Sequence, residues 1–201
     1  MNKIITIGRE FGSGGRELGR RLAEKLGYQY YDKEIITEIA KHTSLSEEYV
    51  KNLIECKPRS LYPITIGKSI TYIGDYQLMQ QQSVYSAQNE IIKDLASKTD
   101  CVIVGRCADY ILREYNPYRI FVYADLDSRI KRCMERAENV EQLSEKQIKR
   151  HIKEIDKGRA KYYEFYTGKK WGSMENYDLC INTTNYAIKD VTRGIARMIM
   201  E

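Results

Sequence analysis

The stretch KIITIGREFGSGGRELGRRLAEKLG, residues 3–27, contains the three features that decide the fold. Its first six residues are a largely apolar run that ends at a glycine, which is typical of a buried strand. A glycine-rich loop follows, and from Arg16 to Gly27 leucine and alanine recur at helical spacing. The stretch therefore predicts a strand, a glycine loop and a helix in direct succession.

Four further strand-like runs follow, separated by segments with helical periodicity. They are predicted at residues 28–31, 101–105, 118–124 and 177–182. Two of them, 101–105 and 118–124, are largely apolar, as parallel strands buried on both faces tend to be. The alternation predicts an α/β fold with a five-stranded parallel sheet and helices on both faces.

Two helices are expected to begin at a capping box, in which a serine and a Glu or Gln three residues later bind each other's backbone N–H groups. The boxes are Ser44 with Glu47, and Ser144 with Gln147. The second opens a basic helix that runs to about residue 163. A long helix is expected at about 76–98, and residues 56–75 before it show no regular pattern.

Ligands of parallel α/β sheets bind beyond the carboxyl ends of the strands. The segments expected at that edge are 8–16, Asp32, 105–107, Asp125 and 182–184. We therefore look for a functional site among these residues.

Composition indicates one folded domain. The chain has 201 residues, of which 42% are hydrophobic and 30% are charged. No apolar run approaches the roughly 18 residues of a membrane span, and the N-terminal residues lack the apolar core of a signal peptide. We expect a cytoplasmic protein without a membrane partner.

The glycine loop has the features of a phosphate-binding loop. Gly12, Gly14 and Gly15 allow a tight turn that brings backbone N–H groups, including that of Ser13, close to a ligand. The helix start adds N–H donors and a partial positive charge, which suit phosphate. The guanidinium of Arg16, directly after the last glycine, can hold phosphate oxygens through two hydrogen bonds.

The loop departs from the pattern GxxxxGK[ST]. With Arg16 in the lysine position, Glu10 replaces the first glycine and Glu17 replaces the hydroxyl residue that ligates Mg²⁺. Glu17 either binds the metal itself or only favours the helix start, so the metal ligands stay open. A tight strand-to-helix turn without a ligand is also compatible with these residues.

A dinucleotide-binding loop is another interpretation. Asp32 lies 20 residues after Gly12, which fits the acid that binds a ribose. The pattern GxGxxG starting at Gly12 would, however, need a glycine where the chain has Glu17. This mismatch disfavours the dinucleotide interpretation.

The net charge of +5 is concentrated in one segment. Residues 129–170 hold 13 basic and 7 acidic residues, so the remainder of the chain is nearly neutral. Such a segment favours a polyanion, either a polyphosphate ligand or a nucleic acid, although a solvated helix face is equally compatible. A nucleic-acid-binding module is disfavoured because no aromatic-rich sheet motif accompanies the charge.

Five blocks of the sequence together resemble the cytidylate kinase-like family. They are GREFGSGGRELGRRLAEKLG (8–27), VIVGRCADYIL (102–112), YADLDSRIKRCMER (123–136), DKGRAKYYEFYTGKKWG (156–172) and YDLCINTT (177–184). The resemblance spans nearly the whole chain, and the blocks come in the family's order. It implies the P-loop NTPase fold of the nucleoside monophosphate kinases, with a helical acceptor-binding insert and a basic lid.

The resemblance also implies a division of the single domain 1–201. The core comprises residues 1–32, 99–128 and 171–201, the acceptor-binding insert residues 33–98, and the lid residues 129–170. The implied activity is ATP-dependent phosphorylation of a nucleoside monophosphate, CMP, dCMP or a related small acceptor, with Mg²⁺. The alternative is a nucleotide-binding regulatory protein that has lost phosphoryl transfer.

Residue roles follow by position from the same resemblance. The donor nucleotide is assigned to Gly12, Ser13, Gly14, Gly15, Arg16, Glu17, Arg129 and Arg132, and the acceptor to Asp32, Arg106, Cys107 and Arg159. The catalytic residues are expected to be Arg16, Arg106 and Arg159. Cys107 and Glu38 stand where the family has an aspartate and an arginine, and with Glu17 they motivate the regulatory alternative.

Overall fold

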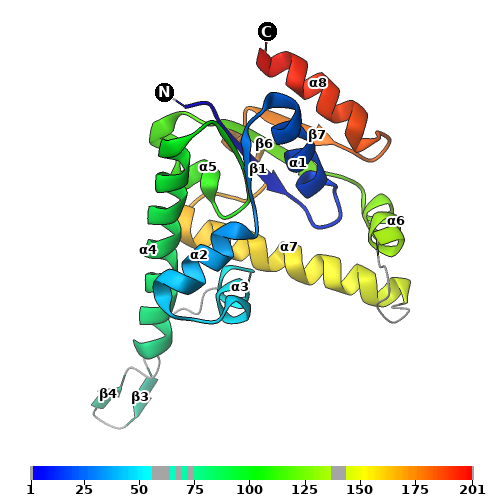
Figure 1. Cartoon of the computed structure of the whole chain (residues 1–201). Coiled ribbons are helices and arrows are strands. Elements are labelled where there is room, and N and C mark those ends of the chain that lie inside the picture. Colours follow the sequence, from blue (N-terminus) through cyan, green and yellow to red (C-terminus); the bar gives the residue numbers. More distant parts are fainter. Residues whose placement is uncertain (1, 56–63, 67–68, 72–74, 137–143, 201) are drawn as a thin grey trace.

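The computed structural model of the protein describes residues 2–55, 64–66, 69–71, 75–136 and 144–200 (Figure 1). A five-stranded sheet with the order β2-β5-β1-β6-β7 forms its centre. The strands are β1 (Ile4–Arg9), β2 (Gln29–Tyr31), β5 (Cys101–Val104), β6 (Tyr118–Tyr123) and β7 (Leu179–Asn182). All neighbouring strands of this sheet run parallel, so the predicted sheet is confirmed.

Side chains of the central strands alternate between two apolar cores, because successive residues of a strand point to opposite faces. In β5, Cys101 and Ile103 belong to one core, whereas Val102 and Val104 belong to the other. All four are buried. The continuous apolar run in the sequence is therefore the consequence of a strand that is covered on both faces.

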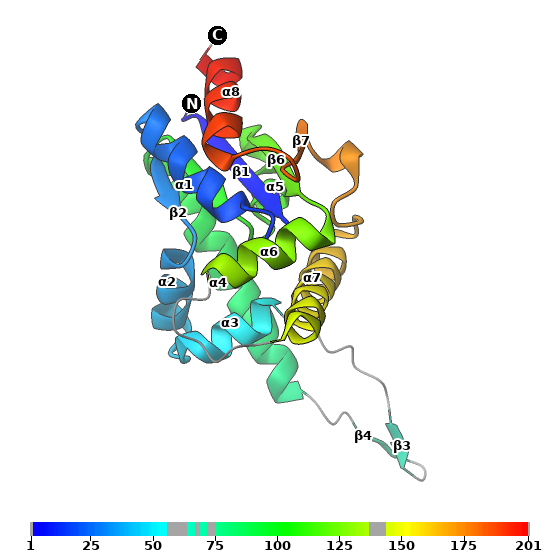
Figure 2. The same ribbon diagram turned by 90° about the vertical axis from the view of Figure 1, so that its right-hand side faces the viewer.

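Helices cover both faces, as predicted. Helices α1 (Gly15–Leu26) and α8 (Ile188–Met200) pack on one face, where Leu18, Leu22 and Ile195 are buried (Figure 2). The other face is covered by α2 (Glu34–Thr43), α3 (Glu47–Glu55), α4 (Asp75–Lys98), α5 (Ala108–Ile111) and part of α7 (Glu145–Thr167).

Helix α7 lies across the end of the sheet toward which β1 points, as Figures 1 and 2 both show. It packs against α3 and against α6 (Leu126–Arg136). Its predicted capping box is confirmed, because the Ser144 N–H donates to Gln147 Oε1 (2.8 Å) and the Gln147 N–H donates to Ser144 Oγ (3.4 Å). The carboxyl ends of the strands thus face a long helix that belongs to the basic segment.

Two expectations for the region before α4 were wrong. Ser44 does not cap α3 but ends α2 with a left-handed φ of 55°, while Ser46 Oγ accepts from the Tyr49 N–H (3.2 Å). The link between the helices is so short that the serine nearest the second helix provides the cap. In the segment expected to be irregular, β3 (Ile64–Ile66) and β4 (Ser69–Thr71) pair as antiparallel strands.

Two single-turn helices, η1 (Arg113–Tyr115) and η2 (Met174–Asn176), complete the described elements. Within the described ranges, none of the helices is long and apolar enough to cross a membrane.

Candidate active site

The glycine loop after β1 is closely packed against neighbouring elements. A Cβ atom at Gly12 would lie 3.0 Å from the Arg129 carbonyl oxygen, and one at Gly14 would lie 2.4 Å from Ile188 Cδ1. Both glycines have positive φ, 78° and 85°. Gly14 is the N-cap of α1 and has no side chain to cap the helix, and N–H groups at a helix start are suited to bind an anion.

Buried polar contacts with Thr183 and Arg132 hold the backbone of the glycine loop in place. Ser13 is fully buried, and its carbonyl oxygen accepts from Thr183 Oγ1 (2.7 Å). Arg132, expected at the donor nucleotide, donates from Nη1 to Thr183 Oγ1 (3.2 Å) and from Nη2 to the Thr183 carbonyl oxygen. The structure therefore places Arg132 behind the loop, where it fixes the backbone of Ser13 through Thr183.

Two arginines flank the carboxylate of Asp32 at the end of β2. Asp32 is buried, and its Oδ2 lies 2.5 Å from Nε of Arg16. Its Oδ1 lies 3.8 Å from Nη2 of Arg9, the last residue of β1. The Arg16 side chain is 52% exposed, whereas Arg9 is 8% exposed as a residue. Asp32 thus separates an outward-facing cation from a buried one.

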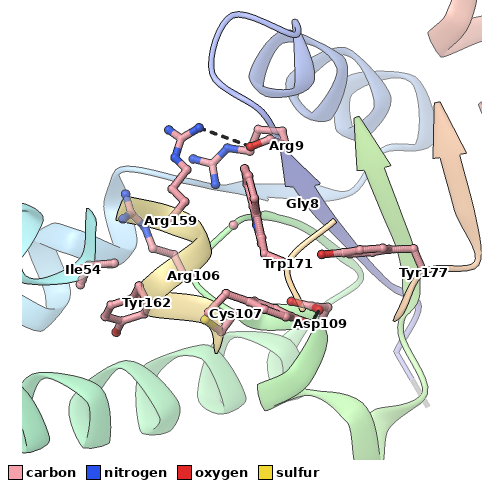
Figure 3. A pocket seen from close by; sticks show the side chains of 12 residues that line it. Gly8, Arg9, Ile54, Arg106, Cys107, Asp109, Arg159, Tyr162, Trp171 and Tyr177 are labelled. Carbon is pink, nitrogen blue, oxygen red and sulfur yellow. Dashed lines mark hydrogen bonds between the residues drawn. The ribbon is translucent and has the colours of Figure 1, made fainter. Parts of the chain in front are cut away.

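A pocket lies beside the loop, between the end of β1, the turn after β5 and helix α7 (Figure 3). We call it the arginine pocket, because Arg9, Arg106 and Arg159 line it. Its other lining residues are Gly8, Ile54, Gly105, Cys107, Asp109, Tyr162, Tyr163, Trp171 and Tyr177. Arg159 Nη1 donates to the Arg9 carbonyl oxygen (3.3 Å), and its guanidinium lies 5.6 Å from the centre of the Phe11 ring. Helix α7 is therefore in direct contact with the glycine loop.

The turn that presents Arg106 is strained. Gly105, Arg106 and Cys107 all have positive φ, at 76°, 60° and 52°. Left-handed backbone at a residue other than glycine is unfavourable by about 1–3 kcal/mol and is concentrated at functional sites. The buried Gln88 side chain supports the turn, since its Nε2 donates to the Arg106 carbonyl oxygen (3.0 Å).

The floor of the pocket holds a carboxyl group bound to a phenol. The Tyr163 hydroxyl donates to Asp109 Oδ2 at 2.6 Å. Burial raises the pKa of Asp109 above its usual range, and this hydrogen bond opposes the rise. Burial, with a smaller contribution from Asp109, raises the pKa of the Cys107 thiol well above its ordinary value. Cys107 is accordingly a neutral thiol and not a nucleophile.

Two further carboxylates lie against the glycine loop. Asp156 Oδ1 of α7 accepts from the Phe11 N–H (2.7 Å), and its Oδ2 pairs with Arg129 Nη1 at 2.6 Å. Glu10 Oε2 lies 3.3 Å from the same Arg129 atom and accepts from the Ala124 N–H (3.2 Å). Burial raises the pKa of Glu10, and Arg129 opposes this shift. Arg129, expected at the donor nucleotide, is held between two acids in this structure.

The structure thus divides the residues singled out from the sequence into three groups. Arg106, Cys107 and Arg159 share the arginine pocket. Residues 12–15, with Arg129 and Arg132 against them, form the loop region. The third group, Arg16, Glu17 and Asp32, lines an outer groove in which the Glu17 carboxylate pairs with Arg21 Nε at 2.8 Å.

Three residues of the site were missed, namely Arg9, Asp109 and Asp156. Arg9 ends the first strand, within the segment 8–16 expected at the ligand edge, so its position was a usable signal. No sequence signal marked Asp109 or Asp156, because their partners Tyr163 and Phe11 are far away in the sequence.

The groups present fit a polyphosphate better than a protein-bound metal cluster. The N–H groups at the start of α1 and the nearby arginines suit phosphate oxygens. Within the part of the chain that the structure describes, no three His, Cys, Asp or Glu side chains are grouped to hold a metal ion. A Mg²⁺ ion would therefore depend on phosphate oxygens for most of its ligands, as it often does with nucleotides.

Comparison with known proteins agrees with this arrangement. Residues 4–185, nearly the whole chain, match the family described as the cytidylate kinase-like family. The chain belongs to that family. Among curated proteins, the chain is similar to a cytidylate kinase of Methanopyrus kandleri, which is 23% identical over 100% of this chain and 94% of its own length. A cytidylate kinase of Haloarcula marismortui is 24% identical over 91% of this chain and 82% of its own length.

Solved structures show the same fold. An uncharacterized protein from Eubacterium ventriosum is 30% identical, with a TM-score of 0.71 over 100% of this chain and 99% of its own. Shikimate kinase from Bacteroides thetaiotaomicron is 12% identical and has a TM-score of 0.58, with 99% of each chain covered. The expected P-loop kinase fold is therefore confirmed, and the family supports a nucleotide kinase.

Proposed function

We propose that this member of the family is an ATP-dependent phosphotransferase that phosphorylates a nucleoside monophosphate, with CMP and dCMP as the first candidate acceptors. The observation that carries the proposal is the meeting of Arg106 and Arg159 in one pocket beside the glycine loop. They come from the turn after β5 and from α7, and Arg159 also contacts the segment that leads to the N–H groups at the start of α1. Phosphoryl transfer requires mainly such positioning and positive charge.

In this proposal the loop residues 12–15 and the start of α1 hold the phosphates of ATP. Mg²⁺, if it binds together with ATP, would supply positive charge at the phosphate oxygens. Arg106 binds the phosphate of the acceptor, and Arg159 lies between both nucleotides because it contacts the loop through Arg9 and Phe11. Aromatic residues on the far wall, among them Trp171 and Tyr177, provide a surface for the ring of the acceptor.

The same proposal assigns roles to the two helical regions. Residues 33–98 form the acceptor-binding insert, and residues 129–170, with α7, form the lid that excludes water during transfer. A lid built on α7 accounts for the basic segment, since its cations would meet a polyphosphate when the lid is closed. The reaction is placed in the cytoplasm, and nucleic acid is not part of it.

ADP release in the presence of Mg²⁺ and a panel of nucleoside monophosphates tests the proposal. We expect acceptor-dependent ADP release, and we expect Arg106→Met to reduce it by about 100-fold or more, because a charge-stabilising donor is removed. Lack of turnover with every acceptor would count against catalysis.

The regulatory alternative is favoured by the occupation of the Phe11 N–H by the carboxylate of Asp156. Glu17, which brings no hydroxyl for Mg²⁺ and pairs with Arg21, points in the same direction. Calorimetry separates the two functions. ATP binding without turnover, unchanged in Glu17→Ser, would support a nucleotide sensor, whereas turnover would exclude it.

A further inference from the structure

Arg9 occupies space that two glycines leave open for it. A Cβ atom on Gly15, the first residue of α1, would lie 2.5 Å from Arg9 Cβ and 3.1 Å from Arg9 Cγ. A Cβ atom on Gly105 would lie 1.7 Å from Arg9 Nη1. Neither position therefore tolerates a side chain while Arg9 keeps its place. The start of α1 and the end of β5 are both shaped around a single arginine.

The start of α1 suggests which consensus residue Arg9 replaces. In a P-loop the pattern GxxxxGK[ST] joins a strand to a helix. If the N-cap Gly14 is taken as the second glycine, the lysine position falls on Gly15 and the first glycine position on Arg9. The chain then has a cation where the pattern has glycine, and glycine where the pattern has a cation. A lysine at position 15 and the arginine at position 9 would compete for the same space. The chain therefore keeps one cation at this place but presents it from the end of β1.

The surroundings of Arg9 are strongly positive. Burial lowers the pKa of Arg9 well below its ordinary value, Arg159 and Arg106 lower it further, and Asp32 opposes them. The ion pair with Asp32 Oδ1, at 3.8 Å, is longer than a hydrogen bond, and among the residues that the structure describes this oxygen has no hydrogen-bond partner. A guanidinium keeps its proton in proteins, so the lowered pKa reflects an unfavourable buried cation that a bound anion would stabilise.

Arg16 is less suited to this task. Half of its side chain is exposed, its Nε is bound to Asp32, and it lines the outer groove and not the arginine pocket. Asp32 therefore stands between Arg16 and Arg9, and only Arg9 lies on the side of Arg106 and Arg159.

We propose that Arg9 is a catalytic residue that replaces the P-loop lysine and binds the transferred phosphoryl group from the end of β1. This inference rests on the proposed function. During transfer an acceptor phosphate oxygen forms a bond to the γ-phosphorus, the bond from that phosphorus to the ADP oxygen breaks, and Arg9 stabilises the charge on the non-bridging oxygens without changing its own bonds.

The test compares four variants with the wild type, namely Arg9→Met, Arg9→Gly, the exchange Arg9→Gly/Gly15→Lys, and the control Arg193→Met. The control removes an exposed arginine of α8 that pairs with Asp190 and lines neither the arginine pocket nor the outer groove. Calorimetry with ATP and with inorganic tripolyphosphate measures binding, and ADP release measures turnover. Thermal melting without ligand and with tripolyphosphate reports on folding.

We expect Arg9→Met to weaken tripolyphosphate binding by about tenfold or more and turnover by about 100-fold or more. Its melting temperature without ligand should not fall, because a buried cation among cations is removed, while the rise produced by tripolyphosphate should shrink. The exchange variant should recover at least about tenfold over Arg9→Gly, because it restores the consensus lysine. Arg193→Met should match the wild type.

Wild-type binding of tripolyphosphate by Arg9→Met would overturn the proposal. So would a lower melting temperature without ligand combined with an unchanged rise on adding tripolyphosphate, which would assign Arg9 a structural role with Asp32. If the wild type binds tripolyphosphate but phosphorylates no acceptor, the proposed function fails, and the binding comparison still decides the role of Arg9.

Discussion

The carboxylate of Asp156 accepts a hydrogen bond from the backbone N–H of Phe11 at 2.7 Å, so helix α7 contributes an anion to the glycine loop. The other oxygen of the same carboxylate lies 2.6 Å from Arg129 Nη1. A loop N–H and an arginine are the groups that a phosphate would use. Asp156 therefore occupies binding groups for which a nucleotide would compete.

Removal of the Asp156 charge should strengthen nucleotide binding. We predict that Asp156→Asn binds ATP roughly fivefold more tightly, a gain of about 1 kcal/mol, because an amide competes less well than a carboxylate for the loop N–H and Arg129. The free protein should lose about 1–3 kcal/mol in its free energy of unfolding, since a hydrogen bond to a charged group is weakened.

Calorimetry with ATP and urea unfolding measure the two effects. Glu154→Gln is the control, because Glu154 lies on the same helix but is exposed, where it pairs with Arg150 Nε at 2.8 Å. Weaker ATP binding by Asp156→Asn would show that this carboxylate supports the binding conformation and does not compete with it.

The close packing of Gly14 against α8 gives a second prediction. Gly14→Ala should lower the free energy of unfolding by about 2–4 kcal/mol, since it combines a positive φ of 85° with a Cβ position 2.4 Å from Ile188 Cδ1. Gly27 has a φ of 71°, but an added Cβ atom there would meet no described atom within 4 Å. Gly27→Ala should therefore lower the free energy of unfolding by only about 1–2 kcal/mol.

A double-mutant cycle checks the cause. Ile188→Val removes the Cδ1 methyl, so the pair Gly14→Ala/Ile188→Val should be less destabilised than the sum of the single changes. Strict additivity, measured by urea unfolding, would mean that backbone strain alone explains the loss at Gly14.

The buried acid Asp109 predicts a pH dependence of stability. Its pKa in the folded state is raised, chiefly by burial, above the ordinary value of 3.8. Its protonated form is therefore favoured by folding, and this contribution is present below pH 3.8 and is lost as the pH rises through the folded pKa. Asp109→Asn keeps an oxygen that accepts from Tyr163 but does not ionise.

Urea unfolding at several pH values measures the difference between Asp109→Asn and the wild type. The variant should gain relative stability as the pH is raised above about 4 until the difference becomes constant above the folded pKa. Asp178→Asn should behave in the opposite way, because Arg119 lowers the pKa of Asp178. A pH-independent difference for Asp109→Asn would show that this carboxyl group titrates normally.

The central sheet and its flanking helices could be predicted because periodicity and glycine positions are properties of short stretches of sequence. The run Cys101–Val104 is apolar because both faces of β5 are covered, and the glycine loop marks the junction of β1 and α1. The capping box at Ser144 was confirmed, whereas Ser44 misled because Ser46 lies closer to the start of α3.

Fewer residues of the candidate site could be predicted from the sequence, because its contacts join distant parts of the chain. The resemblance brought Arg106 and Arg159 forward, and the structure places both in one pocket. Arg9 was overlooked because its significance depends on Gly15 and Gly105, whose missing side chains make room for it only in three dimensions. For Asp156 no motif exists, because it meets Phe11 through tertiary packing of α7.

The transfer of the γ-phosphoryl group from ATP to CMP, followed by ³¹P NMR in the presence of Mg²⁺, tests the central claim most directly. For the wild type, the γ-phosphate signal of ATP should decline while the signals of ADP and CDP rise in equal amounts, and Arg106→Met should slow this by about 100-fold or more. A γ-phosphate signal that stays constant with CMP and every other nucleoside monophosphate, or that is converted only to inorganic phosphate, would contradict a phosphotransferase at the arginine pocket.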